Sequence, residues 1–212
     1  MEDKTQKYYS ETRPELLDFY PKDIRRLLDV GCSSANFSAS LKARSNVEVW
    51  GIEMNVAAAE EAKKKIDKVF IGDLCEIIKT LPLKNFDCIG FNDILEHLYD
   101  PWQVLRDIKA NLTSDGVVVA SIPSFLEIKN LFKLIGRKEW EYTKEGTLDF
   151  THVRFFTKKS MIRMFVDCGY RVIRIEGINP KTSIKWKVFN LLTFGFFSES
   201  SYLQFVCIAK PA

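Results

Sequence analysis

Short apolar runs alternate along this chain with segments whose apolar residues lie three or four positions apart. The runs, typical of buried strands, cover residues 26–30, 47–53, 68–71, 86–91 and 116–122. The segments between them have the spacing of amphipathic helices. These helical segments cover residues 36–44, 57–65 and 102–112, and a further helix is expected around 13–20. Strands that alternate with helices predict an α/β fold with a parallel sheet covered on both faces.

The first strand ends in a turn suited to a bound nucleoside. Asp29 and Val30 are followed by Gly31, Cys32 and Ser33, and small residues at such a turn allow a ligand to approach the backbone. The second strand ends at an acid, Glu53. An acid at this point of a βαβ unit accepts hydrogen bonds from ribose hydroxyls.

The turn favours a cationic nucleoside over a dinucleotide. A dinucleotide fingerprint needs Gly-x-Gly-x-x-Gly, but the corresponding residues here are Gly31, Ser33 and Asn36. Asp29 would also repel a phosphate while suiting a positive charge. S-adenosylmethionine has no phosphate and carries an ammonium and a sulfonium, so it fits better than NAD. An NAD-dependent oxidoreductase is the alternative.

Further acids and amides follow successive predicted strands. Asp73 follows the third strand, and Asn92 and Asp93 follow the fourth. A single acid in such a place is more often a helix cap. Because the carboxyl ends of parallel strands meet at one edge of the sheet, four strands that end this way predict a shared pocket.

Taken together, these motifs resemble those of class I S-adenosylmethionine-dependent methyltransferases. The resemblance rests on Leu28-Asp29-Val30-Gly31-Cys32, Ile52-Glu53, Gly72-Asp73, residues 86–93 and residues 95–101. It implies a Rossmann-like, seven-stranded, mostly parallel sheet with helices on both faces. One antiparallel strand would lie at 203–208, with 170–175 as its hairpin partner.

The resemblance also assigns roles in binding S-adenosyl-L-methionine. Gly31 and Cys32 would line its methionine end, Glu53 would bind the ribose, and Asp73 with Leu74 would bind the adenine. The full set of residues predicted to contact the cofactor is Tyr9, Arg13, Asp29, Gly31, Cys32, Ser33, Glu53, Met54, Gly72, Asp73, Leu74, Asn92, Asp93 and Leu95. For Tyr9 and Arg13, ordinary packing is an equal alternative.

This chain departs from the family at the first turn, where Ser33 and Ala35 replace two glycines. If either position needs a positive φ, its side chain costs roughly 1 kcal/mol. Weaker cofactor binding, or a non-catalytic scaffold with this fold, would be the consequence.

Residues 124–156 form a second informative region, predicted to be a helical lid inserted after the fifth strand. The segment Leu148-Asp149-Phe150-Thr151-His152-Val153-Arg154-Phe155-Phe156-Thr157 resembles methyltransferases associated with glycosyltransferases and polysaccharide biosynthesis. The resemblance implies a small-molecule or saccharide acceptor. Core packing is the expected role of Phe155 and Phe156.

A hydroxyl acceptor needs a general base, and histidine is the usual one. The chain has only two histidines, His97 and His152. We expect His152 to be the base, with Asp149 orienting its ring or holding a substrate hydroxyl, and His97 to be the second choice. The structural alternatives are that Glu96 and His97 cap a helix, and that Asp149 and His152 form an anchoring hydrogen bond.

Composition adds few constraints. With 212 residues, 46% hydrophobic content and sixteen Phe, one domain over 1–212 is expected. It would comprise an N-terminal helix within 1–24, the lid at 124–156 and a second insertion at 180–200. The net charge of +3 makes nucleic acid an unexpected partner. The five cysteines have no metal-site spacing, so no bound metal is expected. Their number and spacing are typical of reduced thiols, and a cytoplasmic location is expected.

Residues 184–197 are apolar and aromatic, with lysines among them. A cover over the acceptor pocket or a dimer contact is the commoner role for such a segment, and docking on a membrane surface is a weaker alternative. Either a monomer or a homodimer is compatible with the sequence. The sequence thus predicts a cytoplasmic O-methyltransferase.

Overall fold

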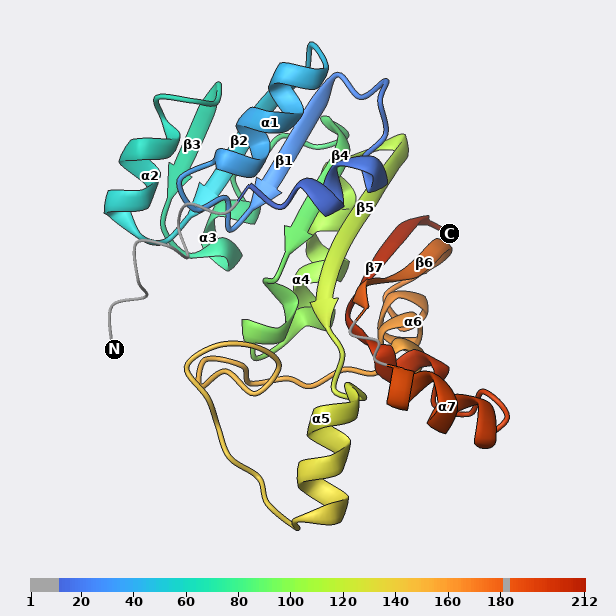
Figure 1. Cartoon of the computed structure of the whole chain (residues 1–212). Coiled ribbons are helices and arrows are strands. Elements are labelled where there is room, and N and C mark those ends of the chain that lie inside the picture. The colour runs from blue at the N-terminus through green and yellow to red at the C-terminus, as the bar shows by residue number, and fades with distance from the viewer. Residues whose placement is uncertain (1–11, 181–183) are drawn as a thin grey trace.

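Seven strands form a single sheet in the computed structural model, which describes residues 12–180 and 184–212 (Figure 1). The strands are β1 (Arg26–Val30), β2 (Glu48–Glu53), β3 (Lys68–Ile71), β4 (Phe86–Asn92), β5 (Leu112–Pro123), β6 (Tyr170–Pro180) and β7 (Tyr202–Pro211). Their order across the sheet is β3-β2-β1-β4-β5-β7-β6. Within the described sheet β7 is the reversed strand, antiparallel to both β5 and β6, and the other pairs are parallel. The predicted seven-stranded, mostly parallel fold is confirmed.

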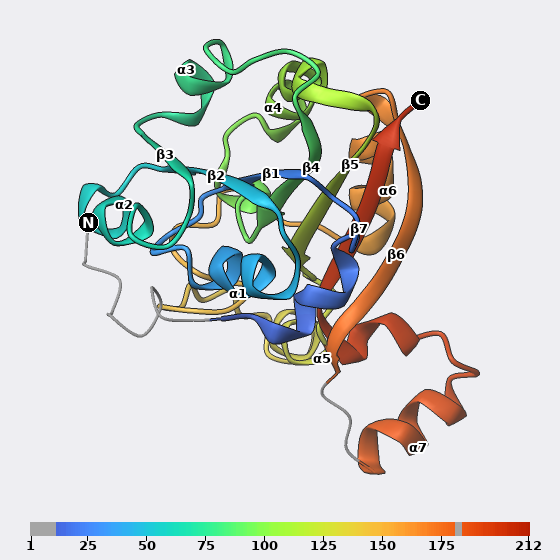
Figure 2. The ribbon, with the colours of Figure 1, turned by 90° about the horizontal axis from the view of Figure 1, so that it is seen from above.

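Helices cover both faces of this sheet (Figure 2). The α-helices are α1 (Asn36–Arg44), α2 (Val56–Ala62), α3 (Leu74–Ile78), α4 (Pro101–Ile108), α5 (Ile128–Leu131), α6 (Lys158–Asp167) and α7 (Ile184–Leu192). The 3-10 helices are η2 (Pro14–Phe19), η3 (Leu95–His97), η4 (Lys109–Asn111) and η6 (Ser198–Ser201), and η5 (Phe132–Gly136) is a π-helix. One core cluster joins the sheet to α3, α4 and α6, and the other joins it to η2 and α1.

The alternation of side chains along β1 produces the two cores. Leu28 and Val30 belong to one cluster, whereas Leu27 belongs to the other. Successive side chains of a strand point to opposite faces, so a strand with helices on both sides needs apolar residues at nearly every position. This requirement explains why the runs were recognisable in the sequence.

Several predicted elements differ from the structure in their bounds; the helices expected at 57–65 and 102–112, for example, end at Ala62 and Ile108. The helix expected around 13–20 is a 3-10 helix of 6 residues, Pro14–Phe19, because Arg13 before it has a left-handed backbone with φ of 46°. The strand expected to begin at Gly116 begins at Leu112, where a register irregularity pairs Leu112 with Phe86. The strand expected at 170–175 extends to Pro180, because it pairs with β7 along almost its whole length.

Two segments project from the sheet. After β5 the chain forms α5 and the continuous turn η5 and then returns along an extended path, confirming a helical insertion (Figure 1). Between β6 and β7 lies α7, with Leu191, Leu192 and Phe194 largely exposed. Within the residues that the structure describes, no helix has the length and apolar character needed to cross a membrane.

The turn between β1 and α1 has a strained backbone. Ser33 has φ of 52° and Ala35 has φ of 57°, in the left-handed region that favours glycine. Gly31 has φ of 69°. The two residues that replace the family's glycines therefore sit where a side chain is unfavourable.

Asp29 of β1 is a buried acid beneath this turn. Its side chain is 3% exposed, and the Ser38 hydroxyl of α1 donates to its Oδ2 at 2.5 Å. Burial raises the pKa of Asp29 to about 7, opposed by the Ser38 hydrogen bond and assisted by the negative charge of Glu53. The site thus contains a carboxyl group that would ionise more readily beside a cation.

Replacing Ser33 by glycine should stabilise the protein by about 1 kcal/mol, because it relieves the left-handed strain. The free energy of unfolding from urea titration measures this. Ser33→Ala keeps Cβ and removes the hydroxyl, so it should stabilise less. An equal increase in the free energy of unfolding for the two variants would contradict backbone strain at position 33.

Ionisation of Asp29 should make stability depend on pH. Because the folded state holds this proton more tightly than the unfolded chain, stability attributable to Asp29 is complete below pH 3.8 and declines until about pH 7. Asp29→Asn removes this contribution. Thermal unfolding of both proteins from pH 4.5 to 8 should show the wild type losing stability relative to the variant as pH rises, and parallel profiles would contradict it.

Candidate functional site

The predicted strand-end residues gather at the carboxyl edge of the parallel strands. Gly31, Cys32 and Ser33 follow β1, Glu53 and Met54 end β2, and Gly72, Asp73 and Leu74 follow β3. Asn92, Asp93 and Leu95 follow β4, next to β1 in the sheet. The common direction of these strands brings together residues that are far apart in the sequence. Tyr9 lies outside the described residues.

Glu53 ties the first turn to β2. Its Oε2 accepts a hydrogen bond from the Ser33 amide at 2.8 Å, and its Oε1 accepts from the Asn55 amide at 2.7 Å. The amides of Gly31 and Cys32 both donate to the Ile52 carbonyl. These bonds hold the left-handed turn against the end of β2, where the sequence predicts a ribose.

Several predicted contacts involve side chains that the core occupies. Cys32 is 6% exposed, and a Cβ added at Gly51 would lie 2.5 Å from its Sγ. Burial, with the nearby charges of Asp29 and Glu53, raises the pKa of its thiol well above the usual value. Leu95 is fully buried. Such residues present backbone rather than side chain to a ligand.

Asp73 follows β3 and caps the next helix. Its Oδ1 accepts hydrogen bonds from the amides of Cys75 at 2.8 Å and Glu76 at 3.3 Å. Gly72 before it has φ of 145°. Asp73 is therefore a helix cap, which was the alternative role for an acid at a strand end. The cap uses Oδ1 of the carboxylate and not Oδ2.

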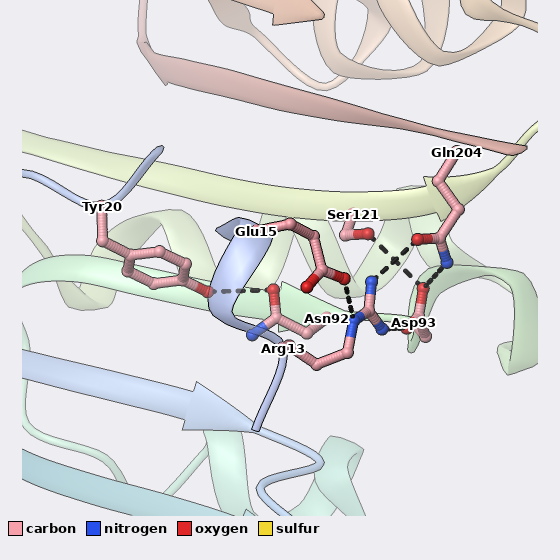
Figure 3. Close-up of polar contacts among 7 residues, drawn as sticks. All are labelled: Arg13, Glu15, Tyr20, Asn92, Asp93, Ser121 and Gln204. Carbon is pink, nitrogen blue, oxygen red and sulfur yellow. Dashed lines mark hydrogen bonds and ion pairs between the residues drawn. The ribbon is translucent and has the colours of Figure 1, made fainter. Parts of the chain in front are cut away.

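Asp93 is the centre of a network that joins three strands to the N-terminal segment (Figure 3). Its carboxylate forms an ion pair with Arg13 and accepts from Gln204 Nε2 at 2.7 Å. Ser121 of β5 donates to the same carboxylate at 3.5 Å. Arg13 in turn donates to Gln204 Oε1 at 2.8 Å. The segment before β1 is thereby fastened over the ends of β4, β5 and β7.

Arg13 keeps its charge in this network. Burial works against the guanidinium, but the carboxylates of Asp93 and Glu15 outweigh that effect and raise its pKa above the ordinary value. Nearby, the Tyr20 hydroxyl donates to Asn92 Oδ1 at 3.1 Å (Figure 3). The sequence did not predict that four further residues belong to this site, because their contacts join elements that are distant in the sequence. These residues are Glu15, Tyr20, Ser121 and Gln204.

The insertion docks on η3 through its backbone. The Glu96 carbonyl accepts hydrogen bonds from the amides of Val153 and Arg154, each at 3.0 Å. Arg154 Nε donates to the Tyr99 carbonyl at 3.0 Å. A capping role for Glu96 and His97 in the next helix is wrong, because Asp100 is the N-cap of α4 and accepts from the Gln103 amide at 2.9 Å.

This docking brings both histidines together. The His97 and His152 rings lie edge to face, with centroids 4.6 Å apart. His97 Nδ1 is 3.1 Å from the Thr151 carbonyl, and His152 Nδ1 is 2.9 Å from the Thr147 carbonyl. The carboxylate of Asp149 accepts from the amide and hydroxyl of Thr151. The Thr147 carbonyl thus orients the His152 ring.

Aromatic rings surround the same insertion. Phe125 stacks on Trp140 with centroids 5.3 Å apart, and Tyr142 stacks on Phe150 at 5.7 Å. Trp140 is 43% exposed and Phe150 is 69% exposed, whereas Phe156 is 3% exposed. The core role expected for Phe156 is confirmed. The more exposed rings belong to the insertion that carries His152.

The first turn fits the cofactor expected there. Ser33 Oγ is buried and has no hydrogen-bond partner within the described part of the chain. A buried hydroxyl in this state is unfavourable unless a ligand satisfies it. Together with the buried acid Asp29 and with Glu53, where the sequence predicts the ribose, the turn suits an adenosine with a positively charged tail.

Comparisons with known proteins identify the family of this chain. A family model described as a methyltransferase domain matches residues 1–175. The ubiquinone biosynthesis O-methyltransferase of Psychrobacter arcticus is 26% identical over 180 residues, which cover 79% of this chain and 68% of that protein. The corresponding protein of Actinobacillus pleuropneumoniae is 30% identical over 106 residues, 46% of this chain and 45% of its own length. The chain therefore spans about half of that relative.

Solved structures share the fold. An S-adenosylmethionine-dependent methyltransferase from Archaeoglobus fulgidus has a TM-score of 0.72 at 19% identity, covering 92% of this chain and 91% of that one. One from Methanosarcina mazei has a TM-score of 0.65 at 15% identity, with 93% and 97% covered. The family match and the carboxyl-edge site lead to one assignment: the chain belongs to the methyltransferase-domain family, and S-adenosyl-L-methionine is its cofactor.

Proposed function

We propose that this chain transfers a methyl group from S-adenosyl-L-methionine to a hydroxyl oxygen of a small molecule. The observation that carries the proposal is the docking of the histidine-bearing insertion onto η3, directly after the cofactor edge of β4. In this proposal the imidazoles of His97 and His152 lie beside the methyl group to be transferred. The names of the curated relatives, ubiquinone biosynthesis O-methyltransferases, support an oxygen acceptor.

The cofactor-binding residues have distinct roles in the proposal. Glu53 binds the ribose hydroxyls with its carboxylate while holding the Ser33 amide. Asp73 binds the adenine amine with its remaining oxygen, and the Ser33 hydroxyl and Asp29 face the methionine end. Arg13 and Asp93 keep the N-terminal segment closed over this edge.

Transfer itself relies mainly on alignment. The bound cofactor supplies a methyl group on a sulfonium, so that a C–O bond forms as the C–S bond breaks and S-adenosylhomocysteine is left. Holding the acceptor oxygen in line with this methyl is the main task of the site. The acceptor proton leaves at the histidine pair, where His152 and then His97 are the predicted bases.

A planar phenol is the acceptor class that the insertion favours. Trp140, Tyr142 and Phe150 offer partly exposed ring faces on the segment that carries His152. Aromatic faces stack on planar aromatic ligands. The sequence motif at 148–157 supports a saccharide hydroxyl as the alternative acceptor.

Glu53→Gln should weaken S-adenosylmethionine binding about 10- to 100-fold, because it removes a charge-assisted hydrogen bond to ribose. Isothermal titration calorimetry measures this, and Glu48→Gln at the other end of β2 is the matched control. The cofactor should raise the melting temperature of the wild type, whereas NAD should not. Stabilisation by NAD alone would overturn the cofactor site.

An acceptor panel tests the reaction. Purified protein with S-adenosylmethionine should form S-adenosylhomocysteine, detected by mass spectrometry, when given catechol or a hydroxybenzoate. Glucose and glucuronate test the saccharide alternative. Product on an amine or imidazole acceptor, with none on any hydroxyl, would contradict oxygen transfer.

A further inference from the structure

Glu96, His97 and His152 form a cluster with the composition of a metal site. One donor atom of each residue lies within 4.8 Å of the donors of the other two. Donors that share one ion are about 3.4 Å apart in tetrahedral geometry and about 4 Å apart when opposite, given metal–ligand distances of about 2.1 Å. Small side-chain rotations would therefore bring the three donors to one ion.

Both imidazoles are held in the tautomer that a metal needs. A carbonyl oxygen only accepts hydrogen bonds, so Nδ1 of His97 donates to Thr151 and Nδ1 of His152 donates to Thr147. In the neutral rings this leaves the lone pair on Nε2. Histidines that bind metals commonly donate their other ring nitrogen to a carbonyl or carboxylate in this way.

The backbone holds these side chains before any ion arrives. Glu96 and His97 belong to η3, while His152 comes from the insertion, and the two segments are joined by the amides of Val153 and Arg154. Glu96 is 1% exposed and His152 is 8% exposed. His97 is less buried, so the cluster is open to a ligand on its side.

We propose that Glu96, His97 and His152 bind one divalent transition-metal ion. Two imidazoles and one carboxylate suit Zn²⁺, Mn²⁺ or Fe²⁺ better than Mg²⁺ or Ca²⁺, which prefer all-oxygen sites. Three protein ligands also leave a position open, as catalytic zinc sites do. The sequence predicted no metal here, because its cysteines lack metal-site spacing and the three residues of this cluster come from segments far apart in the sequence.

The ion would take over the role assigned to the histidines as bases. This part rests on the proposed methyl transfer: an acceptor hydroxyl bound at the open position has a lowered pKa and releases its proton to solvent. Its oxygen then takes the methyl carbon, as the C–S bond of the sulfonium breaks. His97 and His152 act as ligands in that scheme.

Binding is tested on protein freed of any purification tag and dialysed against chelator. Titration calorimetry with ZnCl₂ and MnCl₂ should give one site, and MgCl₂ should bind at least about tenfold more weakly. Because the chain has only two histidines, its proton NMR spectrum has two imidazole Cε1–H signals. Substoichiometric Mn²⁺ should broaden both signals.

Variants locate the site. Glu96→Gln and His152→Gln should each lower Zn²⁺ affinity at least about 100-fold, whereas Cys75→Ser, which removes an exposed thiol, should leave it unchanged. Circular dichroism checks that the variants fold. Unbroadened histidine signals in the wild type, or binding lost only in Cys75→Ser, would overturn the proposal and leave a protein-only Glu–His cluster.

The metal site and the proposed methyl transfer can be contradicted independently of each other. Methyl transfer that continues at full rate in the chelated protein would overturn the catalytic role of the ion while supporting the methyltransferase. Metal binding with histidine broadening, but without transfer to any hydroxyl, would support the metal site and contradict the proposed function.

Discussion

The ion pair between Arg13 and Asp93 is the contact on which the carboxyl edge depends. Asp93 stands where β4 ends, with a left-handed backbone, φ 56°, that its hydrogen bonds must hold. Gln204 and Ser121 bind the same carboxylate from β7 and β5 (Figure 3). A partly buried charge of this kind needs several partners to be favourable. Those partners fix the direction in which the chain leaves β4 toward η3.

That direction links the cofactor turn to the insertion. Ile94, next to Asp93, lies against the turn, since a Cβ added at Gly31 would fall 2.0 Å from its Cδ1. Two residues later, the Glu96 carbonyl receives the amides of the docked insertion. One short segment therefore contacts both the first turn and the insertion, and a shift in it would disturb both.

The strands and their end residues were predictable because burial on both faces leaves a continuous apolar run, as in Leu27–Val30. The contact between the two histidines was not predictable from the sequence. His97 and His152 meet through backbone hydrogen bonds between segments far apart in the sequence, such as those from the Val153 and Arg154 amides to the Glu96 carbonyl, and no side-chain pattern encodes such bonds. The start of η2 at Pro14 likewise follows from the left-handed backbone of Arg13, whose side chain reaches Asp93.

The first turn shows what the missing glycines change. Ser33 and Ala35 hold left-handed backbones that glycine would adopt without strain, and Ser33 adds a buried hydroxyl that has no hydrogen-bond partner among the residues 12–180 and 184–212. Neither feature helps the fold, since the first strains the backbone and the second leaves a polar group unsatisfied. Glu53 nevertheless holds the Ser33 amide in place. A ligand that accepts from the Ser33 hydroxyl would offset both penalties, so the turn is better suited to the bound state than to the free one.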